Sequence, residues 1–344
     1  MSQLNQVIRK ISEGKHLSEA EAFAAVNEIM SGEAQPVEIA AFLTGLRVKG
    51  ETVPEITGAA RSMRVFAIRI HPAVDFLVDP VGTGGDQTGT VNISSAAALV
   101  AAAAGAKVAK HGNRSVSSKS GSADFYEKLG LDITLSPAEV QACIETYGFG
   151  FMFAPTFHPA MRHAAPFLFY FVIRTLFNIL GPLSNPASAQ GHVIGVHDPA
   201  IMPFVAETLK AIGVQHALIV HGSDRTDEIT ISGETAVIEL KDGLIKASII
   251  RPQDFGLSPS PLETIKGDSP ADNVRIVEAA FHGERGPVRD VILMNAAATI
   301  YVGQQASSLQ EGFAKAEAAI DSGAVVRLID QLRTVRHHAE EVAL

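Results

Sequence analysis

Two segments rich in glycine, serine and threonine carry the residue types with the clearest potential for chemistry. The first runs from Asp79 to Ser95 and the second from Lys110 to Ser122. Glycines allow positive φ and close approach, so successive backbone N–H groups can converge on an anion. A helix beginning directly after each loop would add unpaired N–H groups and the positive end of its dipole. Because basic residues lie beside many hydroxyls, the two loops predict a ligand that carries more than one phosphate.

Neither of two standard nucleotide-binding motifs is present in the first loop. Gly82-Thr83-Gly84-Gly85-Asp86-Gln87 begins like a dinucleotide fingerprint, but Gln87 stands where the third glycine is required. Gly84 to Thr90 has the glycine spacing of a P-loop, but Gly89-Thr90 replaces its Gly-Lys-Ser/Thr ending. The alternative is that both loops are plain strand–helix turns. Plain turns do not need so many Ser, Thr and Asn residues beside glycines, so a binding role is favoured.

Asp227-Glu228 is a second candidate site. Adjacent carboxylates following the predicted strand Ala217 to Val220 repel one another unless a cation lies between them. Magnesium takes one or two carboxylates and completes its shell with water and phosphate oxygens. A solvated acidic loop is the alternative, and it would be favoured if the pair stood alone.

Composition limits the class of protein. The chain has 344 residues, of which 47% are hydrophobic and 19% charged, as in a well-cored soluble protein. Its net charge of −9 argues against a general nucleic-acid binder, so a phosphate site must be a local positive pocket. The single cysteine, Cys143, fits a reducing cytosol. We expect no signal peptide, and the apolar stretches Ala96 to Ala106 and Ala164 to Ile173 are too short to span a membrane. We therefore expect a cytoplasmic protein.

The first 70 or so residues predict short helices. Ser18 to Glu21 and Thr52 to Glu55 are capping boxes followed by apolar residues at three-to-four spacing. Pro36 suits a first helical turn and Gly50 suits a helix end.

After about residue 75, apolar strand candidates alternate with helical segments. This alternation predicts a parallel sheet covered on both faces. Glu234 to Ile250 instead resembles a hairpin around Lys241-Asp242-Gly243. The strand candidates are Phe76–Asp79, Ala106–Ala109, Phe149–Phe153, His192–Val196, Ala217–Val220 and Val291–Met294, and the helical segments include Ile93–Ala104, Met202–Ile212 and Ala271–Phe281. The predicted fold class is α/β, with a small all-helical N-terminal domain and a large α/β domain with a mainly parallel sheet.

Several longer motifs closely resemble the anthranilate phosphoribosyltransferase family of tryptophan biosynthesis. They cover nearly the whole chain and form a specific combination. The matching segments are Gly82–Asp86, Asn92–Ser95, Lys110–Ser118, Gly121–Asp124, Phe157–His163, Arg174–Pro186, Val220–Gly222, Asp227-Glu228 and Met294–Ala297.

The resemblance implies a fold of the nucleoside phosphorylase/phosphoribosyltransferase type with its ligands at the domain junction. It implies a helical domain over residues 1–72, a returning helical segment at about 164–186, and an α/β domain over the rest of 73–344. It also implies transfer of the phosphoribosyl group of 5-phosphoribosyl 1-pyrophosphate (PRPP) to anthranilate, with Mg2+, in a homodimer built through the helical domains. We expect no membrane or nucleic-acid partner.

The resemblance also assigns site residues. PRPP would be bound by Gly82, Gly85, Asp86, Thr90, Asn92, Ile93, Ser94, Ser95, Lys110, His111, Gly112, Asn113, Arg114, Ser115, Val116, Ser117, Ser118 and Ser122. Anthranilate would lie near Gly82, His111, Asn113, His158 and the position of Leu168. Mg2+ would be held by Ser94, Asp227 and Glu228. No residue is assigned as a general acid or base.

Two departures from the family pattern stand out. Phe167 to Val172 is an aromatic and apolar run where family members are charged, and Leu168 occupies the position of the arginine that grips the anthranilate carboxylate. Leucine cannot pair with a carboxylate, so impaired anthranilate binding and a simply buried interface helix both stay open. Arg225-Thr226 also departs from the small and apolar residues expected before the acidic pair.

Two rival functions stay open. Pyrimidine nucleoside phosphorylases share the architecture, but their loop has a Lys-x-Ser-Gly-Arg pattern rather than Lys110 to Arg114 of this chain. A non-catalytic nucleic-acid-binding relative would need a basic surface, whereas this chain is acidic.

Overall fold

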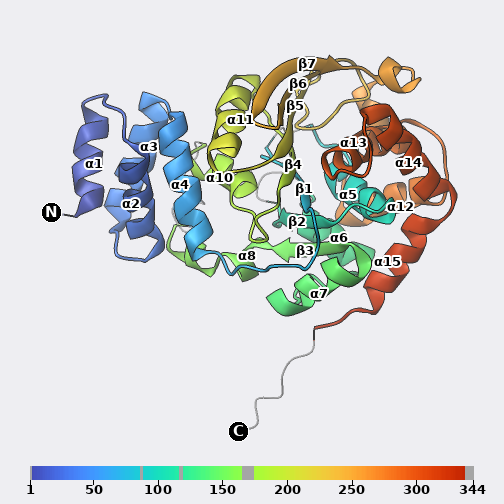
Figure 1. The fold of residues 1–344 in the computed structure, drawn as a ribbon, viewed down its shortest axis with the longest axis horizontal. Coiled ribbons are helices and arrows are strands. Elements are labelled where there is room, and N and C mark those ends of the chain that lie inside the picture. Colours follow the sequence, from blue (N-terminus) through green and yellow to red (C-terminus); the bar gives the residue numbers. More distant parts are fainter. Residues whose placement is uncertain (1, 86–87, 116–118, 165–173, 338–344) are drawn as a thin grey trace, which may run out of the picture.

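The N-terminal region is helical, as its capping signals predict. The computed structural model describes residues 2–85, 88–115, 119–164 and 174–337. Capping boxes open helices at Ser18 and Thr52, Pro36 occupies a first turn, and Gly50 ends a helix with a φ of 86°. The helices are α1 (Gln3–Ser12), α2 (Glu19–Met30), α3 (Pro36–Lys49) and α4 (Val53–Phe66), and they lie together at one end of the molecule (Figure 1).

A seven-stranded sheet with the order β3-β2-β1-β4-β5-β6-β7 forms the centre of the α/β domain. The pairs among β1 to β5 are parallel, whereas β6 and β7 are antiparallel, which confirms the mainly parallel sheet and the hairpin. Asp242 and Gly243 turn this hairpin with φ of 51° and 75°. The strands are β1 (Val78–Gly82), β2 (Val108–Gly112), β3 (Phe149–Phe153), β4 (Gly191–Gly195), β5 (His216–Gly222), β6 (Thr235–Lys241) and β7 (Leu244–Ile250).

Helices cover both faces of the sheet. Successive side chains of a strand point to opposite faces. Val193 belongs to the hydrophobic cluster of α5 (Ile93–Ala103) and α13 (Pro287–Val302), whereas its neighbour Ile194 belongs to the other large cluster, which includes residues of the helical domain. Both faces are therefore buried, as parallel strands require. The remaining helices are α5 (Ile93–Ala103), α6 (Ser122–Leu129), α7 (Pro137–Tyr147), α8 (Ala154–Phe157), α10 (Phe177–Leu183), α11 (Met202–Ala211), α12 (Pro270–Phe281), α13 (Pro287–Val302), α14 (Leu309–Asp321) and α15 (Ala324–Thr334). In the described part of the chain, no helix is both long and apolar enough to cross a membrane.

Helix α10 joins the two domains. Leu176, Leu180 and Leu183 are fully buried in the same hydrophobic cluster as α1 to α4. In addition, Arg64 of α4 donates from Nε to the carbonyl oxygen of Leu183 at 2.8 Å. Residues 176–183 therefore pack on the helical domain, whereas Leu168 lies outside the described residues.

One strand prediction is wrong. Val291 to Met294 lies inside α13, a sixteen-residue helix that begins at Pro287 and is buried along almost its whole length. A short apolar run fits a buried strand and a fully buried helix equally well, so periodicity alone did not distinguish them. The other strand predictions are confirmed, with the predicted ends for β3 and shifted ends for β1, β2, β4 and β5. β2 in particular extends to Gly112, so that Lys110 and His111 are strand residues.

Candidate active site

The two glycine-rich loops leave the sheet at the carboxyl ends of adjacent parallel strands. Gly82 ends β1 and Gly112 ends β2, which pairs with it. Gly84 and Gly85 have φ of 68° and 76°, a conformation that favours glycine. At Gly112 a Cβ atom would lie 2.2 Å from the hydroxyl oxygen of Ser122, so only glycine lets the second loop close on α6. Ligands in parallel α/β sheets bind at this edge.

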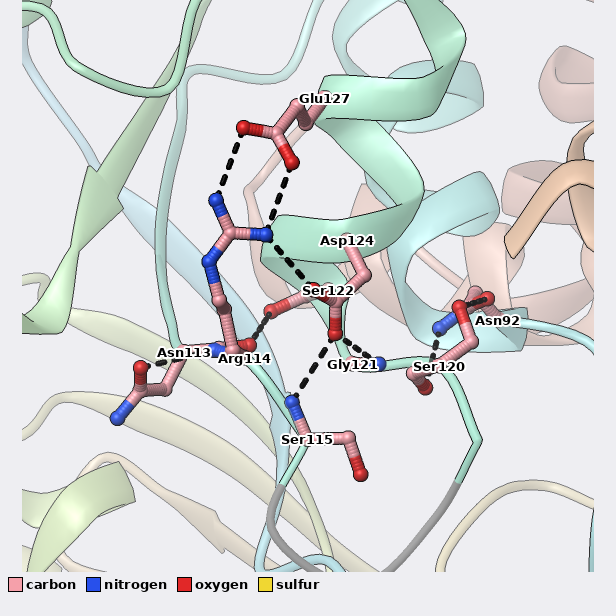
Figure 2. A network of polar contacts seen from close by, with 9 residues as sticks. All are labelled: Asn92, Asn113, Arg114, Ser115, Ser120, Gly121, Ser122, Asp124 and Glu127. Atoms are coloured by element: carbon pink, nitrogen blue, oxygen red, sulfur yellow. Dashed lines mark hydrogen bonds and ion pairs between the residues drawn. The ribbon is translucent and has the colours of Figure 1, made fainter. Parts of the chain in front are cut away.

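Asn92 connects the two loops. It precedes α5, and its Nδ2 donates to the carbonyl oxygen of Ser120 at 3.1 Å. Its Oδ1 accepts from the Ser120 hydroxyl at 2.9 Å (Figure 2). The first loop and the end of the second are therefore fixed relative to one another at the start of α5. Thr90, earlier in the first loop, forms an isolated bridge with Lys266.

The acidic pair lies against the first loop. Asp227 Oδ2 accepts from the N–H of Gly84 at 2.8 Å, and Glu228 Oε1 accepts from the N–H of Ser94 at 3.1 Å. At Gly82 a Cβ atom would lie 2.5 Å from Asp227 Oδ2, so this glycine makes room for the carboxylate. The two acids predicted from sequence and Ser94 are therefore brought together.

The electrostatics of this pair fit a divalent cation. Burial, and then the neighbouring Asp227, raise the pKa of Glu228 to about 8. A cation between the carboxylates would relieve both effects. Among the described residues no group of three or more His, Cys, Asp or Glu side chains is placed to hold a metal. Two carboxylates beside a serine are compatible with Mg2+, which uses few protein carboxylates and takes its other ligands from water and phosphate.

Beneath the loops lies a buried polar cluster that sequence reasoning did not identify as one. Asp79 of β1 accepts from the N–H of His111 at 3.2 Å and from Asn185 Nδ2 at 2.7 Å. Lys110 is 2% exposed, and its Nζ donates to the carbonyl oxygen of Pro80 at 2.5 Å. Burial raises the pKa of Asp79 to about 6, although the Lys110 charge opposes the shift. The available signal was a carboxylate inside an apolar strand, which requires a partner.

Two predicted histidines lie side by side under the domain junction. The rings of His111 and His158 are 4.9 Å apart between centroids, and both side chains are buried. Burial lowers the pKa of His111 to about 3 and that of His158 to about 4, so both are neutral at physiological pH. Neutral imidazole rings suit an aromatic ligand better than a phosphate.

The second loop is held by α6 (Figure 2). Arg114 pairs with Asp124 and Glu127, each through contacts of 2.8 Å. Asp124 Oδ2 also accepts from the N–H groups of Ser115 at 3.1 Å and Gly121 at 2.9 Å. The guanidinium of Arg114 thus lies on acids of the helix that follows its loop, which the sequence prediction for this residue did not foresee.

Arg174 adds a contact between the α10 segment and the first loop. Arg174, at the start of the segment leading into α10, donates to the carbonyl oxygens of Gly84 and Gly85, a contact that sequence reasoning missed. Five predicted site residues lie outside the described part of the chain: Asp86, Val116, Ser117, Ser118 and Leu168.

Comparison with family models supports the two-part organisation. Residues 5–67 match the helical bundle domain of a glycosyl transferase family, and residues 75–326 match the α/β domain of that family.

Whole proteins match over nearly their full length. Anthranilate phosphoribosyltransferase from Symbiobacterium thermophilum is 48% identical, over 97% of this chain and 98% of the relative. The enzyme of this name from Acetivibrio thermocellus is 47% identical, over 95% of each chain.

Solved structures agree. The crystal structure of anthranilate phosphoribosyltransferase from Thermus thermophilus superposes with a TM-score of 0.90 at 42% identity, covering 95% of this chain and 98% of the other. The Saccharomyces cerevisiae enzyme in complex with PRPP and Mg has a TM-score of 0.87 at 28% identity, covering 96% of each. On the fold, the paired loops and this full-length similarity, the chain belongs to the anthranilate phosphoribosyltransferase family.

Proposed function

We propose that this chain transfers the phosphoribosyl group of PRPP to the amine of anthranilate, giving N-(5-phosphoribosyl)anthranilate and pyrophosphate in tryptophan biosynthesis. The observation that carries the proposal is the meeting of two amide-rich loops and an acidic pair at one edge of the sheet. Relatives of that name match at up to 48% identity over nearly the whole chain.

The first loop would bind the pyrophosphate and the second loop the ribose 5-phosphate. Backbone N–H groups and hydroxyls are strong partners for phosphate oxygens, and a lysine adds a point charge. The assigned residues are Gly82, Gly85, Asp86, Thr90, Asn92, Ile93, Ser94, Ser95 and Lys110 through Ser118, with Ser122. Of these, the Lys110 ammonium is buried below the strand ends, so in this structure it supplies a positive potential rather than an exposed contact.

Ser94, Asp227 and Glu228 would hold Mg2+. When bound, Mg2+ neutralises the charge that develops on the departing pyrophosphate. The support is the fit described above: two carboxylates whose repulsion a cation relieves, next to the loop assigned to pyrophosphate.

Anthranilate would bind near Gly82, His111, Asn113 and His158. The C1–O bond to pyrophosphate breaks, the C1–N bond to the amine forms, and the amine releases a proton to solvent. An aromatic amine is unprotonated at neutral pH, so its lone pair attacks without a strong general base. Catalysis would come mainly from positioning and from stabilising the leaving group.

The residue at position 168 should affect the binding of the acceptor, anthranilate. We expect Leu168→Arg to lower the Michaelis constant for anthranilate about tenfold to a hundredfold, because a charge-assisted hydrogen bond contributes about 1.5–3 kcal/mol. The measurement is initial rate against anthranilate concentration at saturating PRPP. An unchanged constant would mean that the carboxylate is held elsewhere.

The activity is tested by the loss of anthranilate fluorescence on adding PRPP and Mg2+. We expect loss only when both are present, with stoichiometric release of pyrophosphate. Phosphorolysis of uridine or thymidine without any such loss would favour a nucleoside phosphorylase instead.

We further propose a cytoplasmic homodimer that forms through the helical domains, with the domain boundary near residue 72 and a returning segment at about 164–186. Support comes from α3, where Val37 is 73% and Val48 is 82% exposed, and from the packing of α10 on the helical domain. The net charge of −9 supports small-molecule rather than nucleic-acid partners. Light scattering of the wild type and of Val48→Glu would test the dimer, which the charged variant should weaken.

A further inference from the structure

The acidic pair lies in the connection between β5 and β6. Asp224, in the same connection, accepts hydrogen bonds from residues on both sides of the pair. Asp224 Oδ1 accepts from the N–H of Thr226 at 3.2 Å and from its hydroxyl at 2.7 Å. Asp224 Oδ2 accepts from the hydroxyls of Thr230 and Ser232, the latter at 2.6 Å. One carboxylate therefore ties the residue just before the acidic pair to residues just after it.

Asn295 of α13 fixes the same connection from outside. Its Oδ1 accepts from the N–H of Ile229 at 3.0 Å, and its Nδ2 donates to the carbonyl oxygen of Ile229 at 2.8 Å. Asn295 is 2% exposed and also donates to Val291 in its own helix, so it is firmly placed. The residue next to Glu228 is thus bound through both of its backbone groups to a buried helix.

The backbone of the connection is closed on itself as well. The N–H of Gly222 donates to the carbonyl oxygen of Thr226 at 2.9 Å, and the N–H of Arg225 donates to the carbonyl oxygen of Gly222 at 2.8 Å. Fixed points on both sides leave the backbone of Asp227 and Glu228 little freedom. Their side chains are the groups left to face the first loop, where they accept from Gly84 and Ser94.

We propose that Asp224 and Asn295 are positioning residues that hold the carboxylates of Asp227 and Glu228 in the geometry required by the Mg2+ complex of PRPP. The inference rests on the proposed function and extends it to residues that touch neither metal nor substrate. In a loose loop the two carboxyl groups would be free to separate, and part of the binding free energy of the cation would be spent on bringing them together. Mutation of a residue that orients metal ligands typically lowers metal affinity or activity by about 10–100-fold.

The test compares Asp224→Asn with Asp132→Asn. Asp132 lies between α6 and α7 and makes the same local contacts as Asp224 Oδ1, accepting from the N–H of Thr134 at 2.9 Å and its hydroxyl at 2.6 Å. Both variants lose a negative charge from a turn, but only one turn carries the acidic pair. Asparagine keeps the size of the side chain and presents one acceptor oxygen instead of two.

Calorimetric titration of PRPP at a series of Mg2+ concentrations gives the Mg2+ concentration at half-maximal PRPP binding, and thermal melting without ligand gives stability. We expect Asp224→Asn to raise the half-maximal Mg2+ concentration about 10–100-fold. Asp132→Asn should leave it at the wild-type value, although both variants melt at a lower temperature. Lower stability of Asp224→Asn with an unchanged Mg2+ requirement would overturn the proposal, because the aspartate would then be only a turn stabiliser.

Thr226→Val is the milder variant if Asp224→Asn does not fold. It removes one hydroxyl donor to Asp224, and we expect a smaller rise in the Mg2+ requirement; no rise would again overturn the proposal. PRPP binding by the wild type in the presence of Mg2+ distinguishes this result from failure of the proposed function. If the wild type binds no PRPP with Mg2+, the function fails; if it binds and the Asp224→Asn requirement is unchanged, only the positioning role fails.

Discussion

The acidic and basic sides of the site are held by different means. The connection carrying Asp227 and Glu228 is fixed by half-buried hydrogen bonds to Asp224 and by a buried hydrogen bond to Asn295. The second loop is held by the bonds of Asp124 to its N–H groups and also by an exposed ion pair, in which Arg114, its side chain 45% exposed, pairs with Glu127, which is 53% exposed. Buried polar networks are costly to disturb, whereas exposed ion pairs contribute about 0–1 kcal/mol. Disturbing the bonds of the acidic side should therefore cost more free energy than breaking the ion pair of Arg114.

The largest effect expected from this difference follows loss of the acidic pair. Asp227→Asn combined with Glu228→Gln should lower Mg2+-dependent transfer by at least about a hundredfold, because metal-ion stabilisation of a leaving group contributes several kcal/mol. Melting without metal should be unchanged or higher above pH 8, where the variant removes two adjacent charged acids, Asp227 buried and Glu228 half-buried. Unaltered dependence of the rate on Mg2+ in this variant would refute the metal assignment.

The raised pKa of Glu228 also predicts that the stability of the metal-free protein depends on pH, which can be measured without substrate. The folded protein keeps the proton of Glu228 up to about pH 8, whereas the unfolded chain releases it near the ordinary value of 4.5. Raising the pH through this window therefore favours unfolding of the metal-free wild type. Urea denaturation should show the wild type losing stability relative to Glu228→Gln between about pH 5 and pH 8.

The next largest effect belongs to the buried cluster under both loops. Lys110→Met should destabilise the fold by about 1–3 kcal/mol at pH 8, because it removes the positive charge that offsets the burial of Asp79 and the donor to the carbonyl oxygen of Pro80. The cost should shrink at pH 5, where Asp79 takes up a proton. Adding Asp79→Asn should recover part of the loss, and denaturant unfolding of the single and double variants measures both. Additive losses would show that the two charges do not support one another.

Local patterns in the sequence predicted the parts of this fold that depend on neighbouring residues. Glycines and hydroxyls marked both loops, and capping boxes such as that at Ser18 marked helix starts. Contacts between distant segments left no such pattern. The bond of Asn185 to Asp79 spans 106 residues, and nothing near either residue identifies the other. The error at Val291 has the same origin, because only the packing of α13 decides that this apolar run is helical.

The candidate site shows the same division. Asp227, Glu228 and Ser94 were predicted as a set only through resemblance to a family, because Ser94 and Glu228 are 134 residues apart and meet only in the structure. The turn made by Asp224 is local, and its Asp-x-Thr spacing was available in the sequence. It was missed because an aspartate followed two residues later by a threonine is also common in turns without function.

A smaller effect is expected at Arg225, which has a φ of 75° in the connection that carries the acidic pair. A non-glycine residue in this conformation costs about 1–2 kcal/mol, part of which glycine returns through its greater freedom when unfolded. We therefore expect Arg225→Gly to stabilise the fold by up to about 1 kcal/mol, as measured by denaturant unfolding. Arg225→Ala, which keeps a Cβ atom, should not stabilise it. Equal gains in the two variants would assign the effect to loss of the charge rather than to the backbone.

The smallest effect on stability should come from the basic side. Arg114→Gln removes contacts to Asp124 and Glu127, yet these contacts are largely exposed, so the expected loss is under about 1 kcal/mol. Asp124 keeps its bonds to the N–H groups of Ser115 and Gly121, and these hold the loop without the arginine. Asp124→Asn should therefore cost more than Arg114→Gln in denaturant unfolding. If the order were reversed, the exposed ion pairs of Arg114 would contribute more to holding the second loop than the hydrogen bonds of Asp124 do.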